Sequence, residues 1–248
     1  MSTNRWRRVS QVFLGVMAAA ILAPAPAQAQ IVRVGSSSDW NQAIGFNLGY
    51  FVVKGDDKRG EDDVLFRNQD SLIFDTKDFN GATIGAEWLI GLGDYLEGGV
   101  GVGYYQKSVP SIYGALVQDD GTEIEQDLKL RIVPITATVR FLPIGRRNSV
   151  QPYVGAGIGF FNWRYSETGE FVDFNNDVFR ANFEADGNEI GPVVLGGVRV
   201  AASDAWLVGG EIKWQDAKGD TGGIDEGFLG DKIHLGGWTT SLTVHFKF

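Results

Sequence analysis

The chain has 248 residues and a net charge of −9, with 31 acidic side chains against 22 lysines and arginines, and it contains no cysteine. This acidic balance argues against a nucleic-acid partner, because phosphate binding needs concentrated lysine and arginine. The lack of cysteine excludes a disulfide scaffold and a thiol nucleophile. The 34 glycines and 12% aromatic residues together indicate many closely packed strands.

The first 29 residues have the three-part layout of a secretory signal peptide. A basic start with three arginines precedes an apolar stretch over residues 12–23, and the small-residue sequence Ala27-Gln28-Ala29 follows. Pro24 ends the apolar run short of the ~20 residues that a membrane-spanning helix needs. We therefore expect cleavage after Ala29. Removing the three positive charges of the leader changes the net charge from −9 to −12.

Apolar residues alternate with small or polar residues through the rest of the chain, with the period of two that a strand requires. The last segment is the clearest case. Its apolar face holds Trp238, Thr240, Leu242, Val244, Phe246 and Phe248, and its other face is mostly small and polar. A barrel wall between lipid and lumen requires strands of this kind.

The pattern predicts eight strands. They cover residues 40–54, 80–91, 94–108, 127–142, 150–166, 188–202, 205–217 and 233–248. Connections after the second, fourth and sixth strands are short, and the other connections have about 14 to 25 residues. Short periplasmic turns alternating with long surface loops are typical of outer-membrane barrels. We therefore expect an all-β fold, an eight-stranded antiparallel transmembrane β-barrel over residues 40–248, with residues 30–39 as a periplasmic tail.

Residues 127–142 do not fit the simple pattern. The apolar residues are even-numbered up to Ile132 and odd-numbered from Ile135. Pro134 stands at the change, and proline cannot donate a hydrogen bond to the ladder. Because a β-bulge shifts the phase by one residue, we expect a bulge near Val133–Pro134.

These features resemble the small eight-stranded outer-membrane barrels, the family that includes the transmembrane half of outer membrane protein A and outer membrane proteins X and W. In that family a terminal aromatic residue with alternating apolar residues before it is the signal read by the barrel-assembly machinery. The residues that match this signal are Leu242, Val244, Phe246 and Phe248. The resemblance implies a monomer in the cell outer membrane, in contact with lipid and lipopolysaccharide. It does not specify a molecular function, since the family includes adhesins, anchors, small pores and a few enzymes.

Several charged residues face the lumen by their phase. They are Glu87, Glu97, Arg140, Arg199, Glu211 and Lys213, with Arg131 as a further candidate. We expect Glu87 and Glu97 almost opposite each other across the Leu92-Gly93 turn, where two carboxylates repel unless a cation lies between them. Arg140 and Arg199 are the expected counter-ions, because arginine can bind both oxygens of a carboxylate.

The interpretation we favour for these charges is a salt-bridged plug, because an eight-stranded wall encloses room for little more than side chains. One alternative is a gate that opens when the charges rearrange. A second is glycoside-type catalysis by the Glu87–Glu97 pair, which a sealed lumen would deprive of substrate.

The sequence gives little sign of a catalytic or metal site. His234 and His245 are too few for a convincing metal centre. Ser241 and His245 face inward on one strand, but four residues of strand separate them by ~13 Å, so they cannot form a nucleophile–base pair. We therefore expect no enzyme and no cofactor.

The four predicted surface loops are acidic. They cover residues 55–79, 109–126, 167–187 and 218–231 and carry 16 net negative charges, from 22 acids and six bases. They form either a solvated rim or a site where divalent cations bridge the loops to lipopolysaccharide, or where a basic partner binds.

Aromatic residues gather where the two membrane interfaces are expected, as in other membrane barrels. Those near the short turns are Trp88, Tyr95, Trp206, Phe246 and Phe248. Those toward the loops are Tyr104, Tyr105, Trp163, Tyr165, Trp214 and Trp238.

The leading hypothesis is a non-enzymatic outer-membrane barrel that contributes to envelope integrity or surface interaction. The alternative is a narrow pore or a conduit for small or hydrophobic solutes, because apolar residues also face the lumen. These are Phe51, Leu89, Val193, Leu195 and Leu207. A remote alternative is a lipid-modifying enzyme.

Overall fold

The computed structural model describes residues 41–118, 120–173 and 175–248, which belong to one compact unit, residues 34–248. The expected signal peptide at residues 1–29 and the expected tail at residues 30–39 lie outside the described residues.

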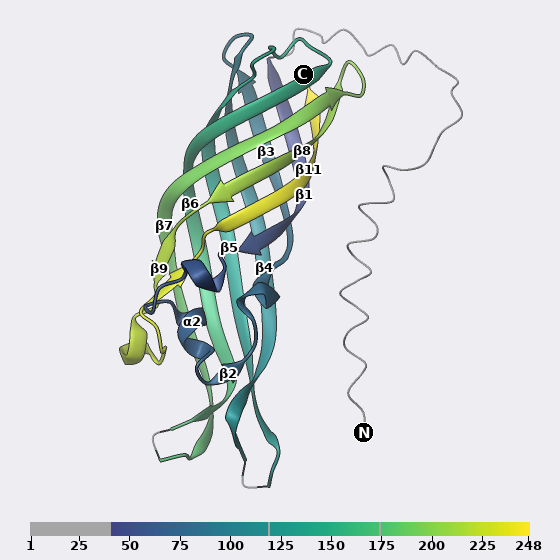
Figure 1. The fold of residues 1–248 in the computed structure, drawn as a ribbon. Coiled ribbons are helices and arrows are strands. Elements are labelled where there is room, and N and C mark those ends of the chain that lie inside the picture. Colours follow the sequence, from purple (N-terminus) through teal and green to yellow (C-terminus); the bar gives the residue numbers. More distant parts are fainter. Residues whose placement is uncertain (1–40, 119, 174) are drawn as a thin grey trace, which may run out of the picture. The chain divides into compact units, whose positions relative to one another are not determined.

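Within the described part of the chain, eight antiparallel strands close into a ring (Figure 1). They are β1 (Gln42–Val53), β3 (Gly81–Gly91), β4 (Leu96–Val117), β5 (Glu123–Phe141), β6 (Val150–Val172), β7 (Val178–Ala201), β8 (Trp206–Gln215) and β11 (Gly237–Lys247). Each strand pairs with its neighbours in the chain, and β11 pairs with β1 from Ala43↔Lys247 to Val53↔Gly237. The expected all-β ring of antiparallel strands is confirmed. Closure leaves no edge strand in the ring.

Two connections carry small elements of their own. Between β1 and β3 lie η1 (Asp56–Lys58), α2 (Val64–Asn68), β2 (Leu72–Ile73) and η2 (Thr76–Phe79). Between β8 and β11 lie β9 (Lys218–Asp220), η3 (Gly223–Glu226) and β10 (Lys232–His234). We call residues 54–80 and 216–236 together the cap. Among the described residues, no helix has the length and hydropathy of a membrane span.

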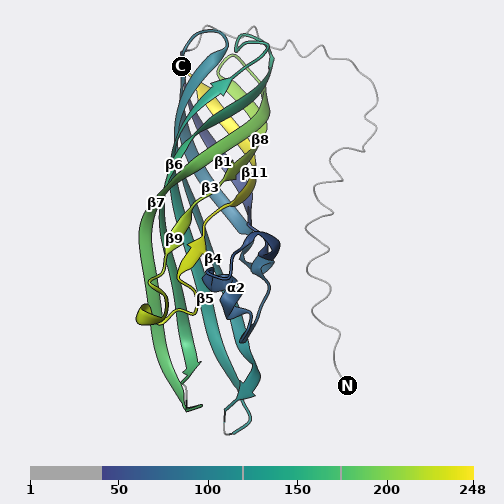
Figure 2. The same cartoon turned by 60° about the vertical axis from the view of Figure 1, so that its left-hand side comes forward.

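Two of the expected long loops are extensions of strands. β4 continues to Val117 and β5 begins at Glu123, so most of the region 109–126 is a β-hairpin. β6 and β7 likewise extend to Val172 and from Val178. Both hairpins reach well beyond the cap in Figures 1 and 2. We call this end of the barrel the loop end, and the end with connections 92–95, 142–149 and 202–205 the turn end.

The expected bulge near Val133–Pro134 is wrong. The pairing of β5 with β6 runs without a register shift from Gln126↔Gly169 to Phe141↔Val154. Even-numbered residues of β5 therefore face inward along the whole strand, and Leu128, Leu130 and Ile132 are buried.

What changes along β5 is its surroundings. Near the turn end its outward residues are apolar and exposed, as at Ile135 and Val139, whereas toward the loop end its inward residues are apolar and buried. A strand in lipid carries apolar residues outside, and a strand in water carries them inside. The apparent phase change therefore coincides with the point where the outward residues of β5 change from apolar to charged.

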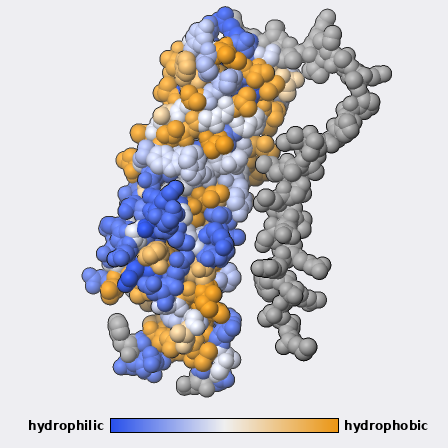
Figure 3. All heavy atoms as spheres, in the orientation of Figure 1, coloured by the Kyte–Doolittle hydropathy of each residue, from blue (hydrophilic) through white to orange (hydrophobic). Residues whose placement is uncertain are grey.

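Exposed apolar side chains form a band around the half of the barrel near the turn end, which we call the apolar belt (Figure 3). On β6 the outward residues from Val150 to Phe160 belong to this belt, and the next outward residue is Asn162. These 11 residues match the ~9–11 that a tilted strand needs to cross a bilayer.

The aromatic residues divide between the belt and the interior. Five aromatic residues are exposed at the turn end, namely Trp88, Tyr95, Trp206, Phe246 and Phe248. Tyr104 and Trp238 are exposed at the edge of the belt nearest the loop end. The expectation that Tyr105, Trp163 and Tyr165 join the outer girdle is wrong, because all three are buried inside the barrel. They lie where the strands have left the belt, so their apolar rings face the core.

Candidate functional site

A group of ion pairs fills the lumen near the turn end. Arg140 on β5 donates to both oxygens of Glu87 on β3, and its Nη2 lies 3.2 Å from Oε2 of Glu211 on β8. His245 on β11 places Nε2 2.7 Å from Oε1 of Glu87. One guanidinium thus bridges two carboxylates from strands that are not neighbours in the ring.

A second pair lies beside the first. Arg199 on β7 binds Glu97 on β4, and both side chains are fully buried. Nε of Arg199 donates to Oε1 of Gln151 at 2.8 Å. The ring of Tyr153 lies 5.0 Å from the guanidinium carbon of Arg140 and 5.5 Å from that of Arg199. Such cation–π contacts join the two pairs.

The hydroxyl of Tyr153 also donates to Oε2 of Glu211 at 3.1 Å. We call the connected residues the lumen network. They are Glu87, Glu97, Arg140, Gln151, Tyr153, Arg199, Glu211 and His245. The charges are arranged so that each buried carboxylate has an arginine, which offsets the cost of removing it from water.

The expected juxtaposition of Glu87 and Glu97 is wrong. Glu87 lies opposite Gly101, whereas Glu97 lies opposite Gly91. The pairing register therefore offsets the two carboxylates by four residues along the wall. Each consequently binds a different arginine, and the structure does not place them as a catalytic pair.

The remaining candidates lie apart from the network. Lys213 faces the lumen on β8, and no ion pair of its side chain occurs among the described residues. Arg131 faces outward, opposite Arg164 on β6. The expectation that Arg131 could face the lumen is wrong, because the register continues unshifted through Pro134.

On the loop-end side of the lumen network lies a cavity of about 40 Å³, which has room for about three water molecules. Its walls include Glu87, Arg140 and Lys213 on the side of the network, and Phe51 and Tyr105 on the side of the loop end. The lumen therefore changes from charged to apolar across this cavity.

Beyond the cavity, the cap and the extended hairpins enclose an apolar core. Its buried members are Phe51, Val53, Val64, Leu65, Leu72, Phe79, Tyr105, Val109, Leu128, Leu130, Ile132, Phe161, Trp163, Tyr165, Val193, Ala217, Phe228, Ile233 and Leu235. Phe51 and Val193 had been predicted to face inward from their phase, as had Leu89, Leu195 and Leu207, and all five are buried. The core closes the barrel toward the loop end.

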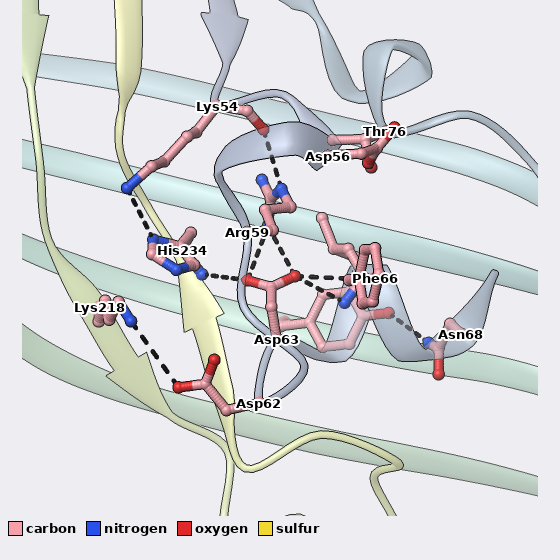
Figure 4. A network of polar contacts seen from close by, with 12 residues as sticks. Lys54, Asp56, Arg59, Asp62, Asp63, Phe66, Asn68, Thr76, Lys218 and His234 are labelled. Carbon is pink, nitrogen blue, oxygen red and sulfur yellow. Dashed lines mark hydrogen bonds and ion pairs between the residues drawn. The ribbon is translucent and has the colours of Figure 1, made fainter. Parts of the chain in front are cut away.

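A buried carboxylate holds the two halves of the cap together (Figure 4). Asp63 receives two hydrogen bonds of 2.8 Å from Nη1 of Arg59, and both side chains are fully buried. Asp63 also accepts from the amides of Leu65 and Phe66 at the start of α2. A side chain in this position satisfies amides that a helix leaves without a partner. His234 lies on the other side of this carboxylate, and burial lowers the pKa of its imidazole.

A second polar contact joins α2 to β6. Asn68 donates to Oε1 of Glu167 at 2.6 Å and to the hydroxyl of Tyr165 at 3.2 Å, while Tyr165 donates to the same carboxylate oxygen at 2.9 Å. Burial raises the pKa of the Glu167 carboxyl and that of the Tyr165 hydroxyl. No cation binds this carboxylate in the contacts that the described residues make.

Some residues of the site were not found from the sequence. Gln151 and Tyr153 share the inward phase of β6 and could have been found by it. Asp63, Asn68 and Glu167 lie outside the membrane pattern, and no sequence spacing connects them. The residues of the expected assembly signal, Leu242, Val244 and Phe246, face outward on β11, and Phe248 is exposed at its end.

Among the described residues, no group of three or more histidine, aspartate or glutamate side chains could hold a metal ion. The carboxylates of the lumen network are bound by arginine, and little free space adjoins them.

No protein-family model and no curated protein matches the chain. Among solved structures, it is similar to the outer membrane protein OprG from Pseudomonas aeruginosa, with 12% identity, coverage of 86% of this chain and 99% of that chain, and a TM-score of 0.47. It is also similar to Neisserial surface protein A, with 13% identity, coverage of 84% of this chain and 97% of that chain, and a TM-score of 0.44. A third similar structure is the outer membrane protease OmpT from Escherichia coli, with 10% identity, coverage of 85% of this chain and 97% of that chain, and a TM-score of 0.41. These are outer-membrane β-barrel proteins whose roles differ, so the likeness concerns the fold and indicates no activity.

Proposed function

We propose that this protein is a closed, non-enzymatic β-barrel of the outer membrane, whose apolar belt spans the bilayer and whose loop end faces the cell exterior. Its role is to contribute to envelope integrity or to present a surface for interaction. The observation that carries this proposal is the filled lumen. The lumen network fills the barrel near the turn end, the apolar core fills it toward the loop end, and a cavity of about 40 Å³ lies between them.

The proposal also rests on what lies outside the bilayer. The two hairpins and the cap extend the barrel beyond the apolar belt, and exposed apolar residues lie near the hairpin tips at Val117, Val178 and Phe179. In this proposal the chain is a monomer that the barrel-assembly machinery inserts through Leu242, Val244, Phe246 and Phe248.

The test is single-channel conductance of the mature, refolded protein in a planar bilayer, with folding verified by a heat-dependent gel shift. We expect a silent bilayer. Steady, reproducible openings from folded protein would overturn the closed-barrel proposal. The absence of catalysis is checked by expressing the protein in a Gram-negative host, where the mass of lipid A should remain unchanged.

One observation favours the alternative of a conduit for small hydrophobic solutes. The pairing of β4 with β5 is interrupted at Gly103 and Tyr104, opposite Pro134 and Val133, and the internal cavity reaches this part of the wall. Proline lacks the N–H that would bridge the gap. If solutes pass here, the protein should speed the entry of an apolar dye into vesicles, and Pro134→Ala should slow it. Equal rates with and without the protein would exclude this alternative.

A further inference from the structure

Two arginines lie directly opposite each other on the outer wall of the barrel. Arg131 on β5 pairs in register with Arg164 on β6, and both side chains face outward. Like charges directly opposite on neighbouring strands destabilise the pair. Arg164 binds Glu184 on β7 at 3.1 Å. No ion pair of Arg131 occurs among the described residues, and its buried Nε has no hydrogen-bond partner there.

The surroundings extend this positive patch toward β4. Lys129 is the next outward residue of β5 toward the loop end. On β4, the uncharged Gln106 and Ser108 lie opposite Arg131 and Lys129. The acidic neighbours lie on the other flank, where Asp186 and Glu184 on β7 adjoin β6, and Asp127 follows Lys129 on β5. Positive charge is therefore concentrated over β5 and its boundary with β6.

The height of the pair relative to the bilayer follows from the same two strands. Four residues before Arg164, Phe160 is exposed and ends the apolar belt, and Ile135 occupies the corresponding place on β5. Four residues of strand span ~13 Å. The arginines therefore lie just beyond the hydrocarbon of the outer leaflet, at the level of lipid headgroups.

We propose that Arg131, Arg164 and Lys129 bind a phosphate group of lipopolysaccharide in the outer leaflet. This rests on the proposed orientation in the outer membrane. Guanidinium groups bind phosphate oxygens in pairs, and an anion between two arginines replaces their repulsion with two attractions. Gln106 and Ser108 supply hydrogen-bonding groups for adjoining sugar hydroxyls.

The charge of the rest of the loop end makes this position distinctive. The segments 55–79, 109–126, 167–187 and 218–231 carry 16 net negative charges, which repel a phosphorylated headgroup over most of this end. A phosphate group in the outer leaflet is therefore attracted to the positive charges of Lys129, Arg131 and Arg164 on β5 and β6. The site binds phosphate directly, without a divalent cation.

The test compares R131Q/R164Q with the wild type. Purified lipopolysaccharide is titrated, in the presence of a chelator, into the folded full-length mature protein in detergent, and the dissociation constant is measured. Loss of two charge-assisted contacts should weaken binding by about tenfold or more. The control R147Q/R180Q changes the net charge equally, at a turn-end pair with Asp94 and a hairpin pair with Glu170. It should bind like the wild type.

A second measurement separates binding from folding. Without lipopolysaccharide, R131Q/R164Q should unfold at about the same urea concentration as the wild type, because the variant loses the repulsion between the arginines together with the exposed Arg164–Glu184 pair, and such a pair contributes little to stability. Lipopolysaccharide stripped of phosphate should bind both proteins alike and weakly. Equal affinity of both proteins for intact lipopolysaccharide would overturn the site, and so would equal affinity of the wild type for phosphatidylglycerol vesicles. Channel openings would sink the closed-barrel proposal and leave these binding results unaffected.

Discussion

The carboxylate of Asp63 accepts a hydrogen bond of 2.8 Å from the backbone amide of His234, which lies 171 residues later in the chain. The same carboxylate binds Arg59 and caps α2. One buried side chain thus joins the connection after β1 to the connection before β11. The cap therefore depends on a charge that is removed from water and fully compensated by its partners.

Asp63→Ala should open the cap while the membrane wall stays folded. Removing one member of a buried ion pair leaves the other uncompensated, which costs about 3–5 kcal/mol. Here the loss falls on the local free energy of cap opening, because the partners of Asp63 lie in the cap. Faster hydrogen exchange at the amides of Leu65 and Phe66, with an unchanged heat-dependent gel shift, is the expected result.

The neighbouring Asp62 provides the control for this substitution. Its carboxylate lies 3.7 Å from Nζ of Lys218, and both side chains are well exposed to solvent. Exposed pairs contribute little to stability, so Asp62→Ala should leave exchange in α2 unchanged. If both substitutions change hydrogen exchange in α2 equally, the contacts of the Asp63 carboxylate do not hold the cap together.

Arg140→Ala should lower the free energy of unfolding of the barrel and should not open a channel through it. The substitution leaves Glu87 and Glu211 buried without the cation that they share, and breaking a buried pair costs about 3–5 kcal/mol. The measurement is the urea midpoint of the folded band in the gel-shift assay, alongside planar-bilayer conductance.

Lys213→Ala is the matched lumen control, since Lys213 faces the same cavity without an ion pair among the described residues. It should shift the midpoint little. A normal midpoint for Arg140→Ala together with new channel openings would identify the lumen network as a gate instead of a plug.

Stability of the cap should fall as pH rises from 4.5, because burial raises the pKa of Glu167 above this ordinary value. Between 4.5 and the raised pKa the folded cap binds more protons than the opened cap, so higher pH favours opening. Glu167→Gln keeps an oxygen that can accept from Asn68 and Tyr165, and it removes the titration. The variant should show a flat response over this range, measured by NMR signals of α2 during urea titration at several pH values.

His234 should act in the opposite sense. Burial lowers its pKa below the ordinary 6.5, and the nearby cations of Lys54, Lys218 and Arg59 lower it further, against the opposing effect of Asp63. The opened cap therefore binds more protons below pH 6.5, and cap stability is lost as pH falls through the lowered pKa. His234→Gln should remove this acid loss. If cap stability still falls as far with falling pH in this variant, a group other than His234 causes the fall.

The alternation of residues predicted the membrane wall well, because lipid imposes a simple rule on each strand. The bounds of β1, β3 and β8 agree with prediction to within two residues at each end. The inward position of Glu87, Arg140 and Glu211 also follows from phase alone. Which carboxylate meets which arginine does not, because the partners depend on register across strands that the pattern leaves open.

The part beyond the apolar belt was predicted less well for a physical reason. There the strands follow the rule for proteins in water, so Leu128 and Ile132 look out of phase with Ile135 although all three obey one register. The hairpins were consequently assigned to loops. The cap was not predicted because Asp63 and Glu167 act through contacts between distant segments, for which the sequence carries no periodic signal.

In the proposed outer-membrane orientation, the reversal of polarity along β5 and β6 also determines how deeply the barrel is immersed. Sinking by one pair of residues, ~7 Å along a strand, would carry Arg131 and Arg164 toward hydrocarbon, where an arginine on the lipid face costs up to about 2–4 kcal/mol at the midplane. Rising by the same amount would bring Ile135 and Phe160 into water, at roughly 25 cal/mol per Å² of apolar surface. The wall therefore fixes its own vertical position, with a restoring force in both directions.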